Sequence, residues 1–238
     1  MVQKNMNKRN QIAHFYNVIA KEKISNRKIP LVVQLMNWTK VWSPDRNEVI
    51  YDLMKKGDRC LDVGVGEGKL LLLAQNKFIH TYGIDISNIR IKNLKMRKEY
   101  ATSSLSTQSI EDKTVFKNNF FDAITLVAVL EHVFDPNHVL QEIRRILKPG
   151  GTLYIEVPNI GWVYPRISLL FGHFPITSTD PGFDGGHIHY FEKHNLTKLL
   201  RENSFTVEHI TCSGFLSRFR NVCPGLLGGD LIVTVRKK

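Results

Sequence analysis

Three glycines at alternate positions follow a short apolar segment that ends at Val63. Gly64, Gly66 and Gly68 lie directly before a Lys-Leu-Leu run that is typical of a helix start. Glycine permits a sharp turn from strand to helix, and its missing side chain lets a ligand lie against backbone N–H groups at the helix N-terminus. Such turns also serve packing alone, but this pattern favours ligand binding at the turn.

Two acidic residues flank this turn in the expected sheet. Asp62 precedes the glycines, and Asp85 ends a second apolar segment 17 residues after Gly68. A carboxylate at the tip of the neighbouring strand accepts both hydroxyl hydrogens of a ribose diol. We expect Asp62 to lie buried under the turn, where it fixes the backbone and is placed to meet a cationic ligand group. The GxGxG spacing and the extra acid disfavour a dinucleotide, whose turn is GxGxxG.

The elements that position these residues alternate in type from residue 59 onward. Short apolar segments alternate with helical patterns, which is typical of βα units and a parallel sheet. Residues 1–55 show no strand pattern, and two prolines divide them into helix-sized pieces. We predict an N-terminal helical extension at 1–55 and a second domain at 56–238. Its expected strands are 59–63, 81–86, 105–110, 122–129, 152–157, 206–212 and 230–235, and its expected helices are 69–76, 88–100, 137–147 and 193–203.

Residues 158–190 interrupt this alternation. They hold four prolines and five glycines among aromatic residues. The segment is too long for an ordinary connection in a compact domain, so we interpret it as a lid or binding insertion.

The net charge of +11 is concentrated at the two ends of the chain. Residues 1–30 carry seven Lys and Arg against one acid, and residues 215–238 carry five against one, so the body between them is almost neutral. A nucleic-acid enzyme usually spreads basic residues over its working face, so nucleic acid is a less favoured partner. The basic run from Arg90 to Lys98 lies on an expected outer helix and is interpreted as a solvated face.

Cysteine content and hydropathy indicate the compartment. Cys60, Cys212 and Cys223 form no CxxC pair and are odd in number, which disfavours a disulfide framework or a zinc cluster and favours a reducing environment. No apolar run approaches the roughly 20 residues of a membrane span, and the N-terminus is polar and basic, unlike a signal peptide. We expect a cytoplasmic protein.

Five motifs follow one another along the chain: Leu61 to Gly68, Gly83 to Ile86, Phe121 to Ile124 with Val129 to Val133 and Asp135-Pro136, Leu147 to Gly151, and His187 to Phe191. Taken in this order, they resemble the class I S-adenosylmethionine-dependent methyltransferases. The resemblance is closest to the small-molecule branch that includes ubiquinone-biosynthesis O-methyltransferases, and it covers about residues 55–235. Each motif alone is unspecific, whereas their joint occurrence in this order is specific.

The resemblance implies a three-layer α/β/α Rossmann-like fold with a seven-stranded sheet whose last strand is antiparallel. It also implies S-adenosylmethionine as cofactor, with its methionine part over the glycine turn, its ribose on Asp85 and its adenine beside the loop at Ser109, for which Asp112 is a competing position. The sulfonium end would face residues 127–132. The cofactor-binding candidates are Asp62, Gly64, Gly66, Gly68, Asp85, Ile86, Ser109, Ile110, Val127 and His132.

This family resemblance implies methyl transfer to a small-molecule acceptor, with oxygen favoured over nitrogen or carbon. A hydroxyl acceptor needs a base, and His132, His187 and His189 are the candidates because histidine titrates near neutral pH. Each of the three also has a purely structural interpretation, such as bracing a loop. Some relatives hold a divalent metal in an E-x-x-E-H cluster, but the first acid is Ala128 here, so no metal is predicted.

Aromatic residues in and before the insertion are the candidates for acceptor binding. Trp162 and Tyr164 lie in the insertion, and Trp38 and Trp42 precede the first strand. They suit an aromatic or lipid-like acceptor, although covering the sheet end is the simpler alternative. The base-amine and 5-methylcytosine enzymes are disfavoured, because their Asn/Asp-Pro-Pro-Tyr/Phe and Pro-Cys motifs are missing. RNA or protein methylation and a non-catalytic S-adenosylmethionine-binding module remain the alternatives, and the oligomeric state stays open.

Overall fold

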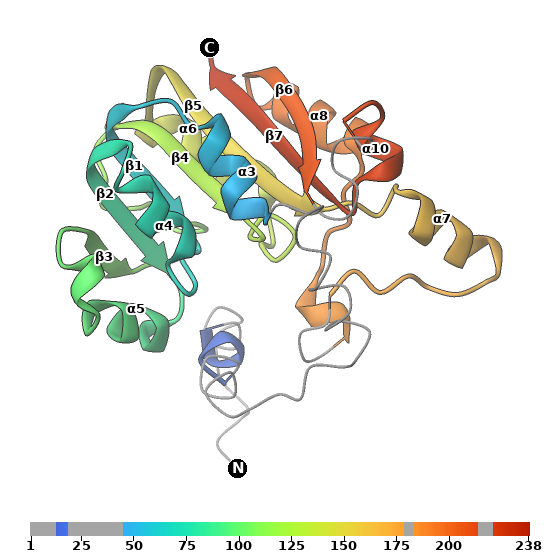
Figure 1. Cartoon of the computed structure of the whole chain (residues 1–238), viewed down its shortest axis with the longest axis horizontal. Coiled ribbons are helices and arrows are strands. Elements are labelled where there is room, and N and C mark those ends of the chain that lie inside the picture. Colours follow the sequence, from blue (N-terminus) through green and yellow to red (C-terminus); the bar gives the residue numbers. More distant parts are fainter. Residues whose placement is uncertain (1–12, 19–44, 179–182, 214–220) are drawn as a thin grey trace.

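A single seven-stranded sheet runs through the centre of the protein in the computed structural model, which describes residues 13–18, 45–178, 183–213 and 221–238 (Figure 1). The strand order is β3-β2-β1-β4-β5-β7-β6. Strand β7 is antiparallel to both of its neighbours, and the pairs among the first five strands are parallel. The strands are β1 (Gly57–Val63), β2 (Phe78–Asp85), β3 (Ser104–Thr107), β4 (Phe121–Val127), β5 (Leu147–Pro158), β6 (Phe205–Ser213) and β7 (Asp230–Lys237).

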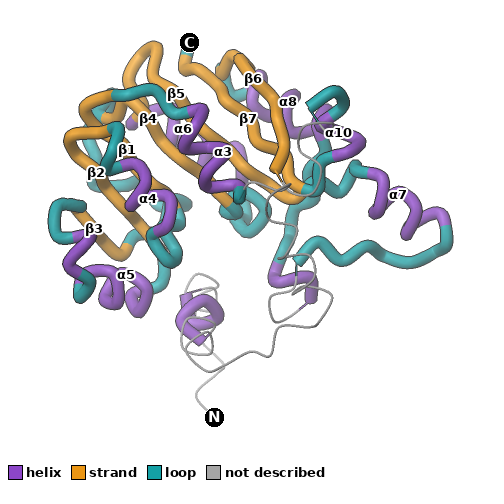
Figure 2. Tube along the Cα trace, in the orientation of Figure 1, coloured by secondary structure: helices purple, strands orange, loops and turns teal. Residues whose placement is uncertain are grey.

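Helices cover both faces of this sheet (Figure 2). Alternate strand residues point to opposite faces: Cys60 of β1 packs with the helices before and after that strand, whereas Leu61 packs with those of the other layer. This three-layer arrangement confirms the predicted fold class. Within the described residues, the helices labelled in Figure 1 and the shorter turns have the following bounds: α3 (Arg46–Leu53), α4 (Lys69–Ala74), α5 (Asn88–Lys95), α6 (Pro136–Ile146), α7 (Val163–Leu170), α8 (Lys193–Glu202) and α10 (Pro224–Leu227), with 3-10 turns at Lys98–Tyr100 and Phe183–Gly186.

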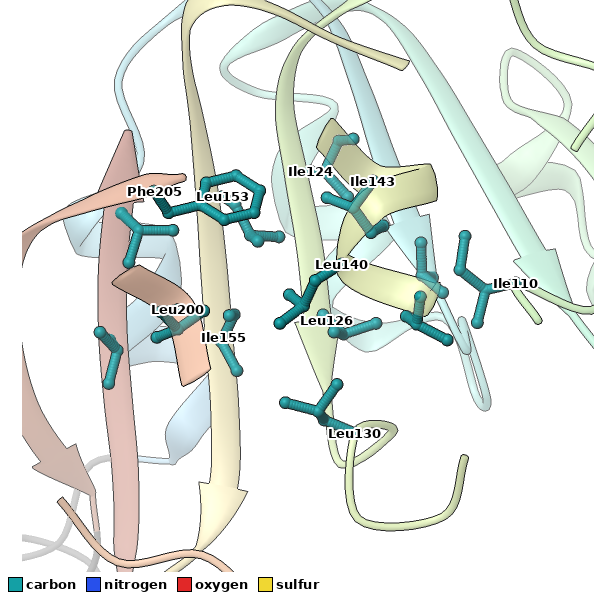
Figure 3. Packing of buried hydrophobic residues seen from close by; sticks show 14 of the residues in the cluster. Ile110, Ile124, Leu126, Leu130, Leu140, Ile143, Leu153, Ile155, Leu200 and Phe205 are labelled. Atoms are coloured by element: carbon teal, nitrogen blue, oxygen red, sulfur yellow. The ribbon is translucent and has the colours of Figure 1, made fainter. Parts of the chain in front are cut away.

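The larger core layer lies between the sheet and helices α6 and α8 (Figure 3). Leu140 and Ile143 of α6 are fully buried against Leu126 of β4, and Leu200 of α8 is buried near Ile155 of β5. Truncating such a side chain to alanine costs about 2–5 kcal/mol. The carboxyl ends of β1, β2 and β4 are thereby held rigidly beside one another.

The end of α3 packs into the main domain rather than apart from it. Ile50 and Met54 are buried with Cys60 and Tyr154 on the face of the sheet opposite to helices α6 and α8. We keep the domain boundary at residue 55 as a prediction. All three cysteines are free thiols, and only Cys223 is exposed. Within the described ranges, no helix is long and apolar enough to cross a bilayer.

Several expected elements end earlier than predicted, and the differences are largest after the third strand and the second helix of the sheet domain. Strand β3 stops at Thr107 rather than at residue 110, because Ser109 turns the chain by accepting a hydrogen bond from the N–H of Glu111 through its hydroxyl. Helix α5 ends at Lys95, and a short 3-10 turn follows it. The residues that follow Thr107 and Lys95 therefore belong to connecting segments near the edge strand β3.

Candidate functional site

The glycine turn after β1 has the backbone geometry that its sequence predicts. Gly64, Gly66 and Gly68 have φ angles of 71°, 54° and 82°, in the left-handed region that favours glycine. The N–H groups of Gly64 and Val65 donate to the carbonyl of Ile84 at 2.8 and 3.0 Å. The turn is therefore fixed to the end of β2, and Gly68 caps the N-terminus of α4.

Asp85 lies at the tip of β2 and is only 3% exposed. Its Oδ2 accepts a hydrogen bond from the N–H of Gly66 at 3.0 Å, and its Oδ1 accepts one from the N–H of Ser87 at 2.8 Å. The guanidinium of Arg90 lies 3.7 Å from Oδ2. Each carboxylate oxygen keeps further acceptor capacity, so the side chain is oriented in advance for two hydroxyl donors.

Asp62 lies buried under the turn, as predicted, with 4% of its surface exposed. The hydroxyl of Thr125 donates to its Oδ1 at 2.6 Å. Burial raises the pKa of Asp62 to about 7, partly offset by the Thr125 hydrogen bond, and the nearby Asp85 adds to the rise. A cation placed against this carboxylate would relieve the cost of its burial.

Two adjoining cavities run along the carboxyl edge of β1, β2 and β4. Tyr16, Gly64, Arg90, Ala128 and His132 line both of them. The first cavity is otherwise lined by Val63, Ile84, Asp85, Ile86, Gln108, Ser109, Ile110, Glu111, Val129 and Val133. The second is otherwise lined by Arg46, Asn47, Asp62, Val65, Gly66, Glu67, Lys69, Leu70 and Val127.

The cavities gather nearly all of the predicted cofactor residues. Gly68 is the one that lines neither: a Cβ built there would lie 2.6 Å from the Tyr100 hydroxyl, so this glycine serves packing. Asp112, the competing position in the loop after β3, also lines neither cavity, whereas Ser109 and Ile110 line the first.

Tyr16 and Arg90 are site residues that sequence reasoning missed. Tyr16 belongs to the short helix at residues 13–18, and its ring lies 5.3 Å from the Arg90 guanidinium and 5.7 Å from the His132 ring. The solvated-face interpretation is wrong for Arg90, whose side chain is 16% exposed because it turns back toward Asp85. No local signal marked either residue.

Arg46 of α3 places a positive charge beside the second cavity. Its Nη1 lies 3.3 Å from both carboxylate oxygens of Glu156, which is completely buried in β5. Burial raises the pKa of Glu156 to about 7, and the opposing effect of Arg46 limits the rise. The cavity thus has an acid, Asp62, and a cation, Arg46, in its lining.

Glu131, His132 and His187 converge beside the shared part of the two cavities. Oε1 of Glu131 lies 3.9 Å from Nε2 of both histidines, and the two rings are 4.7 Å apart. The loop with His187 is held there because the N–H groups of Ile188 and His189 donate to the main-chain carbonyl of Glu131 at 2.9 and 3.1 Å. Sequence reasoning proposed both histidines but gave Glu131 no catalytic role.

Glu131 is the acidic member of this cluster and is 1% exposed. Burial raises its pKa well above the ordinary value, and the neighbouring Glu156 adds to the rise. Its position between the buried Leu130 and Val133 was a signal in the sequence: an acid within an apolar segment requires a partner or a function.

The remaining predicted residues lie apart from this cluster. Nε2 of His189 is 3.3 Å from the carbonyl of Phe134, which is a loop-bracing contact. Trp162 and Tyr164 line neither cavity, and α7 extends away from the sheet with Tyr164 55% exposed (Figure 1). Trp38 and Trp42 lie outside the described residues. An acceptor role for these aromatic residues stays a prediction.

A sequence profile described as a methyltransferase domain matches residues 37–210. The chain belongs to the methyltransferase-domain family. Ubiquinone biosynthesis O-methyltransferases of Xanthomonas oryzae pv. oryzae and Xanthomonas campestris pv. campestris are each 32% identical to this methyltransferase over 105 residues, which are 43% of the chain and 44% of each relative. The match thus spans less than half the length of these curated relatives.

Solved structures share the fold of this methyltransferase. An S-adenosylmethionine-dependent methyltransferase of Methanosarcina mazei is 22% identical with a TM-score of 0.59, over 79% of this chain and 96% of that one. One of Thermotoga maritima, described as a possible histamine N-methyltransferase, is 17% identical with a TM-score of 0.62, over 98% and 100%. A putative methyltransferase of Haloferax volcanii, solved with the Trm112 methyltransferase activator, is 17% identical with a TM-score of 0.58, over 80% and 93%.

We propose S-adenosylmethionine as the methyl donor of this enzyme, because the cavity residues fit it. The second cavity pairs an acid with a cation, Asp62 and Arg46, which matches the ammonium and carboxylate of the methionine part. The carboxylate of Asp85 suits the ribose diol, and the apolar side chains of Ile86 and Ile110 in the first cavity suit adenine. We propose these roles for the residues.

Alanine at Gly66 should weaken cofactor binding more than it weakens folding. A Cβ built at Gly66 meets nothing nearer than 3.7 Å, so it would project into the space where the ligand lies. The left-handed φ angle adds about 1–2 kcal/mol of strain. We expect Gly66→Ala to bind S-adenosylhomocysteine at least about tenfold more weakly, or about 1.4 kcal/mol, in titration calorimetry.

Gly68→Ala is the matched comparison, because the same strain is joined there by a clash with Tyr100. We expect it to lose more unfolding free energy in urea than Gly66→Ala. Equal ligand affinity of Gly66→Ala and the wild type would contradict the placement of the ligand.

Asparagine at Asp62 should stabilise the ligand-free enzyme at alkaline pH. The folded-state pKa of about 7 exceeds the ordinary 3.8, so stability contributed by this carboxyl is fully present below about pH 4 and is lost as the pH rises through 7. The loss is at most about 4 kcal/mol. We expect Asp62→Asn to be more stable than the wild type at pH 8 in urea unfolding, and by less at pH 5.

Asp122→Asn is the control of opposite sign. The pKa of Asp122 is lowered, against the effect of its partial burial, by hydrogen bonds from Lys148 and the N–H of Arg59, so this variant should lose stability at pH 8. A stability difference between Asp62→Asn and the wild type that does not grow from pH 5 to pH 8 would refute the burial argument.

Proposed function

We propose that this enzyme methylates a hydroxyl oxygen of a small-molecule acceptor. The observation that carries the proposal is the Glu131–His132–His187 cluster, because a hydroxyl must lose its proton during methylation and this cluster places the His132 imidazole at the cavity wall, with the His187 ring 4.7 Å from it. The names of the relatives from Xanthomonas support the same acceptor atom. We further propose residues 56–238 as the catalytic domain, with 1–55 as its extension and 158–190 as its insertion.

Hydrogen bonds determine which nitrogen of His187 accepts a proton. The hydroxyl of Thr177 donates its hydrogen to Oδ2 of Asp184 at 2.7 Å. The Thr177 hydroxyl oxygen therefore acts as the acceptor toward His187, and it accepts from the N–H at Nδ1 of that ring, also at 2.7 Å. With its proton on Nδ1, the neutral ring carries its lone pair on Nε2. Nε2 is the nitrogen nearest to Glu131, and it is therefore the proton-accepting atom.

His132 is arranged in a similar way. Its Nδ1 lies 3.2 Å from the carbonyl of Gly186, which acts only as an acceptor, so Nδ1 is the donor. Nε2 then carries the lone pair on the side of Glu131. The carboxylate of Glu131 stabilises an imidazolium formed on either ring.

The cofactor supplies a methyl group that is already activated on a sulfonium. The protein therefore has to orient an acceptor, exclude water and receive one proton at Nε2 of His132 or His187. The turn after β1 and the tip of β2 orient the donor side, and Tyr16 belongs to the lining of both cavities.

The proposal is tested by methyl-transfer assays with a panel of aromatic acceptors in which each hydroxyl compound has an amine counterpart, together with bulk RNA. We expect transfer to hydroxyl compounds. His132→Gln should lower kcat by about 100-fold or more at pH 7 and by less at a pH at which the acceptor hydroxyl ionises by itself.

The exposed His138→Gln serves as the control and should keep wild-type kcat. Transfer to RNA or to amines alone, with no transfer to hydroxyl compounds, would overturn the proposal.

A further inference from the structure

The short helix at residues 13–18 is anchored on two loops beside the cavities. The hydroxyl of Ser87, which caps the N-terminus of α5, donates to Oδ1 of Asn17 at 2.7 Å. A Cβ built at Gly186 would lie 3.4 Å from the ring of Phe15, so this ring packs against the loop at that glycine. The helix is therefore held on both sides of the residue that lies between Phe15 and Asn17.

That residue is Tyr16, which is partly buried and lines both cavities. Its ring lies 5.3 Å from the Arg90 guanidinium and 5.7 Å from the His132 ring. Residues that line both cavities lie where the two cavities adjoin, so a ligand that fills both of them has to pass these residues. Tyr16 is therefore placed against the middle of such a ligand.

The middle of S-adenosylmethionine is its sulfonium, because this sulfur joins the adenosine to the methionine part. With the adenosine in the first cavity and the methionine part in the second, the placement on which this step rests, the sulfonium lies where the cavities adjoin. The sulfonium carries a positive charge. Methyl transfer converts it into the neutral thioether of S-adenosylhomocysteine, so the donor and the product differ in charge at this atom.

The shared part of the two cavities offers a cation little carboxylate charge. Asp85 lines only the first cavity and Asp62 only the second, and no acidic residue in the described part of the chain lines both. Arg90 lines both cavities and adds a positive charge. A sulfonium there needs another source of negative potential, which the face of an aromatic ring supplies. The Tyr16 ring already has this relation to the Arg90 guanidinium.

We propose that Tyr16 is a cofactor-binding residue whose ring stabilises the positive charge of S-adenosylmethionine where the two cavities adjoin. The ring then favours the charged methyl donor over the neutral product. Helix 13–18 thereby belongs to the site, and its anchors on Ser87 and on the loop at Gly186 hold the ring in position.

The test is calorimetric titration of the full chain, without an acceptor, with S-adenosylmethionine and S-adenosylhomocysteine in parallel. Tyr16→Leu should lower the affinity for S-adenosylmethionine about tenfold more than the affinity for S-adenosylhomocysteine, because only the first ligand loses a cation–aromatic contact. Tyr16→Phe keeps the aromatic face, so the ratio of its two affinities should stay within about threefold of the wild-type ratio.

Asn17→Ala is the matched control for displacement of the helix. It removes the anchor on Ser87 and keeps the Tyr16 ring. Any loss of affinity in this variant should be the same for both ligands, so the ratio should equal that of the wild type. A fraction of unfolded protein lowers the number of binding sites rather than the ratio, so the ratio remains a valid measure in a destabilised variant.

The outcomes separate this proposal from the proposed function. Equal losses for both ligands in Tyr16→Leu, unchanged affinities, or an equal shift of the ratio in Asn17→Ala would overturn the role of Tyr16, even in an enzyme that methylates hydroxyl compounds. A loss that is selective for S-adenosylmethionine in Tyr16→Leu and absent in Tyr16→Phe would support it, even in an enzyme that methylates only amines. Failure of the folded wild type to bind either ligand would overturn the cofactor and this role of Tyr16 together.

Discussion

Asp85→Ala should reduce the affinity for S-adenosylhomocysteine by at least about 100-fold. The proposed position of the ribose gives the Asp85 carboxylate two hydroxyl donors, and a hydrogen bond to a charged group contributes about 1.5–3 kcal/mol. Each 1.4 kcal/mol is about tenfold in affinity. The substitution also removes the acceptor for the N–H groups of Gly66 and Ser87, so the glycine turn loses its anchor on β2.

Titration calorimetry of both proteins measures this loss, with unfolding curves to show that the variant is folded. Asp112→Ala is the control, because Asp112 lines neither cavity, and it should bind like the wild type. Affinity of Asp85→Ala within about threefold of the wild type, or about 0.7 kcal/mol, would be incompatible with a ribose at this position.

Arg46→Ala should lower the free energy of unfolding by about 1 kcal/mol at pH 8. Glu156 is completely buried and has both oxygens 3.3 Å from the guanidinium of Arg46, whose own side chain is 41% exposed. Loss of this cation raises the pKa of Glu156 further, so the carboxyl has to take up a proton at pH 8. The pKa of Glu156 is about 7, so at pH 5 this carboxyl is protonated and needs no cation. The loss should therefore be smaller at pH 5.

Urea unfolding at the two pH values checks this prediction. Glu156→Gln removes the charge itself, so adding Arg46→Ala to it should cost little further stability. A loss that is the same at pH 5 and pH 8, or that persists undiminished in the Glu156→Gln background, would show that Arg46 acts by packing rather than by charge.

Residues whose role depends on their own strand end could be predicted from the sequence. The glycine turn and Asp85 combine residue type with a position at the carboxyl end of a parallel strand, and the topology of such sheets brings those ends together. The alternation of apolar segments with helical patterns was sufficient to predict βα units and a parallel sheet, whereas the three layers and the antiparallel last strand were predicted from the family resemblance. These features follow from local geometry that each short segment carries.

Residues whose role depends on distant contacts could not be predicted in this way. Tyr16 meets Arg90 across more than 70 residues of sequence, and His187 meets Glu131 across 56. Arg90 lies in a basic run that favours a solvated face, but its guanidinium turns inward toward Asp85 at the tip of β2 and the ring of Tyr16. Tertiary contact outweighs local pattern in each case.

The most direct test of the proposed cofactor position is a crystal structure of the full chain with S-adenosylhomocysteine. We predict density for the ribose on the Asp85 carboxylate, for adenine beside Ile86 and Ser109, and for the amino-acid end between Asp62 and Arg46. Density for the ligand outside the two cavities, or with the adenosine and amino-acid ends exchanged, would contradict it.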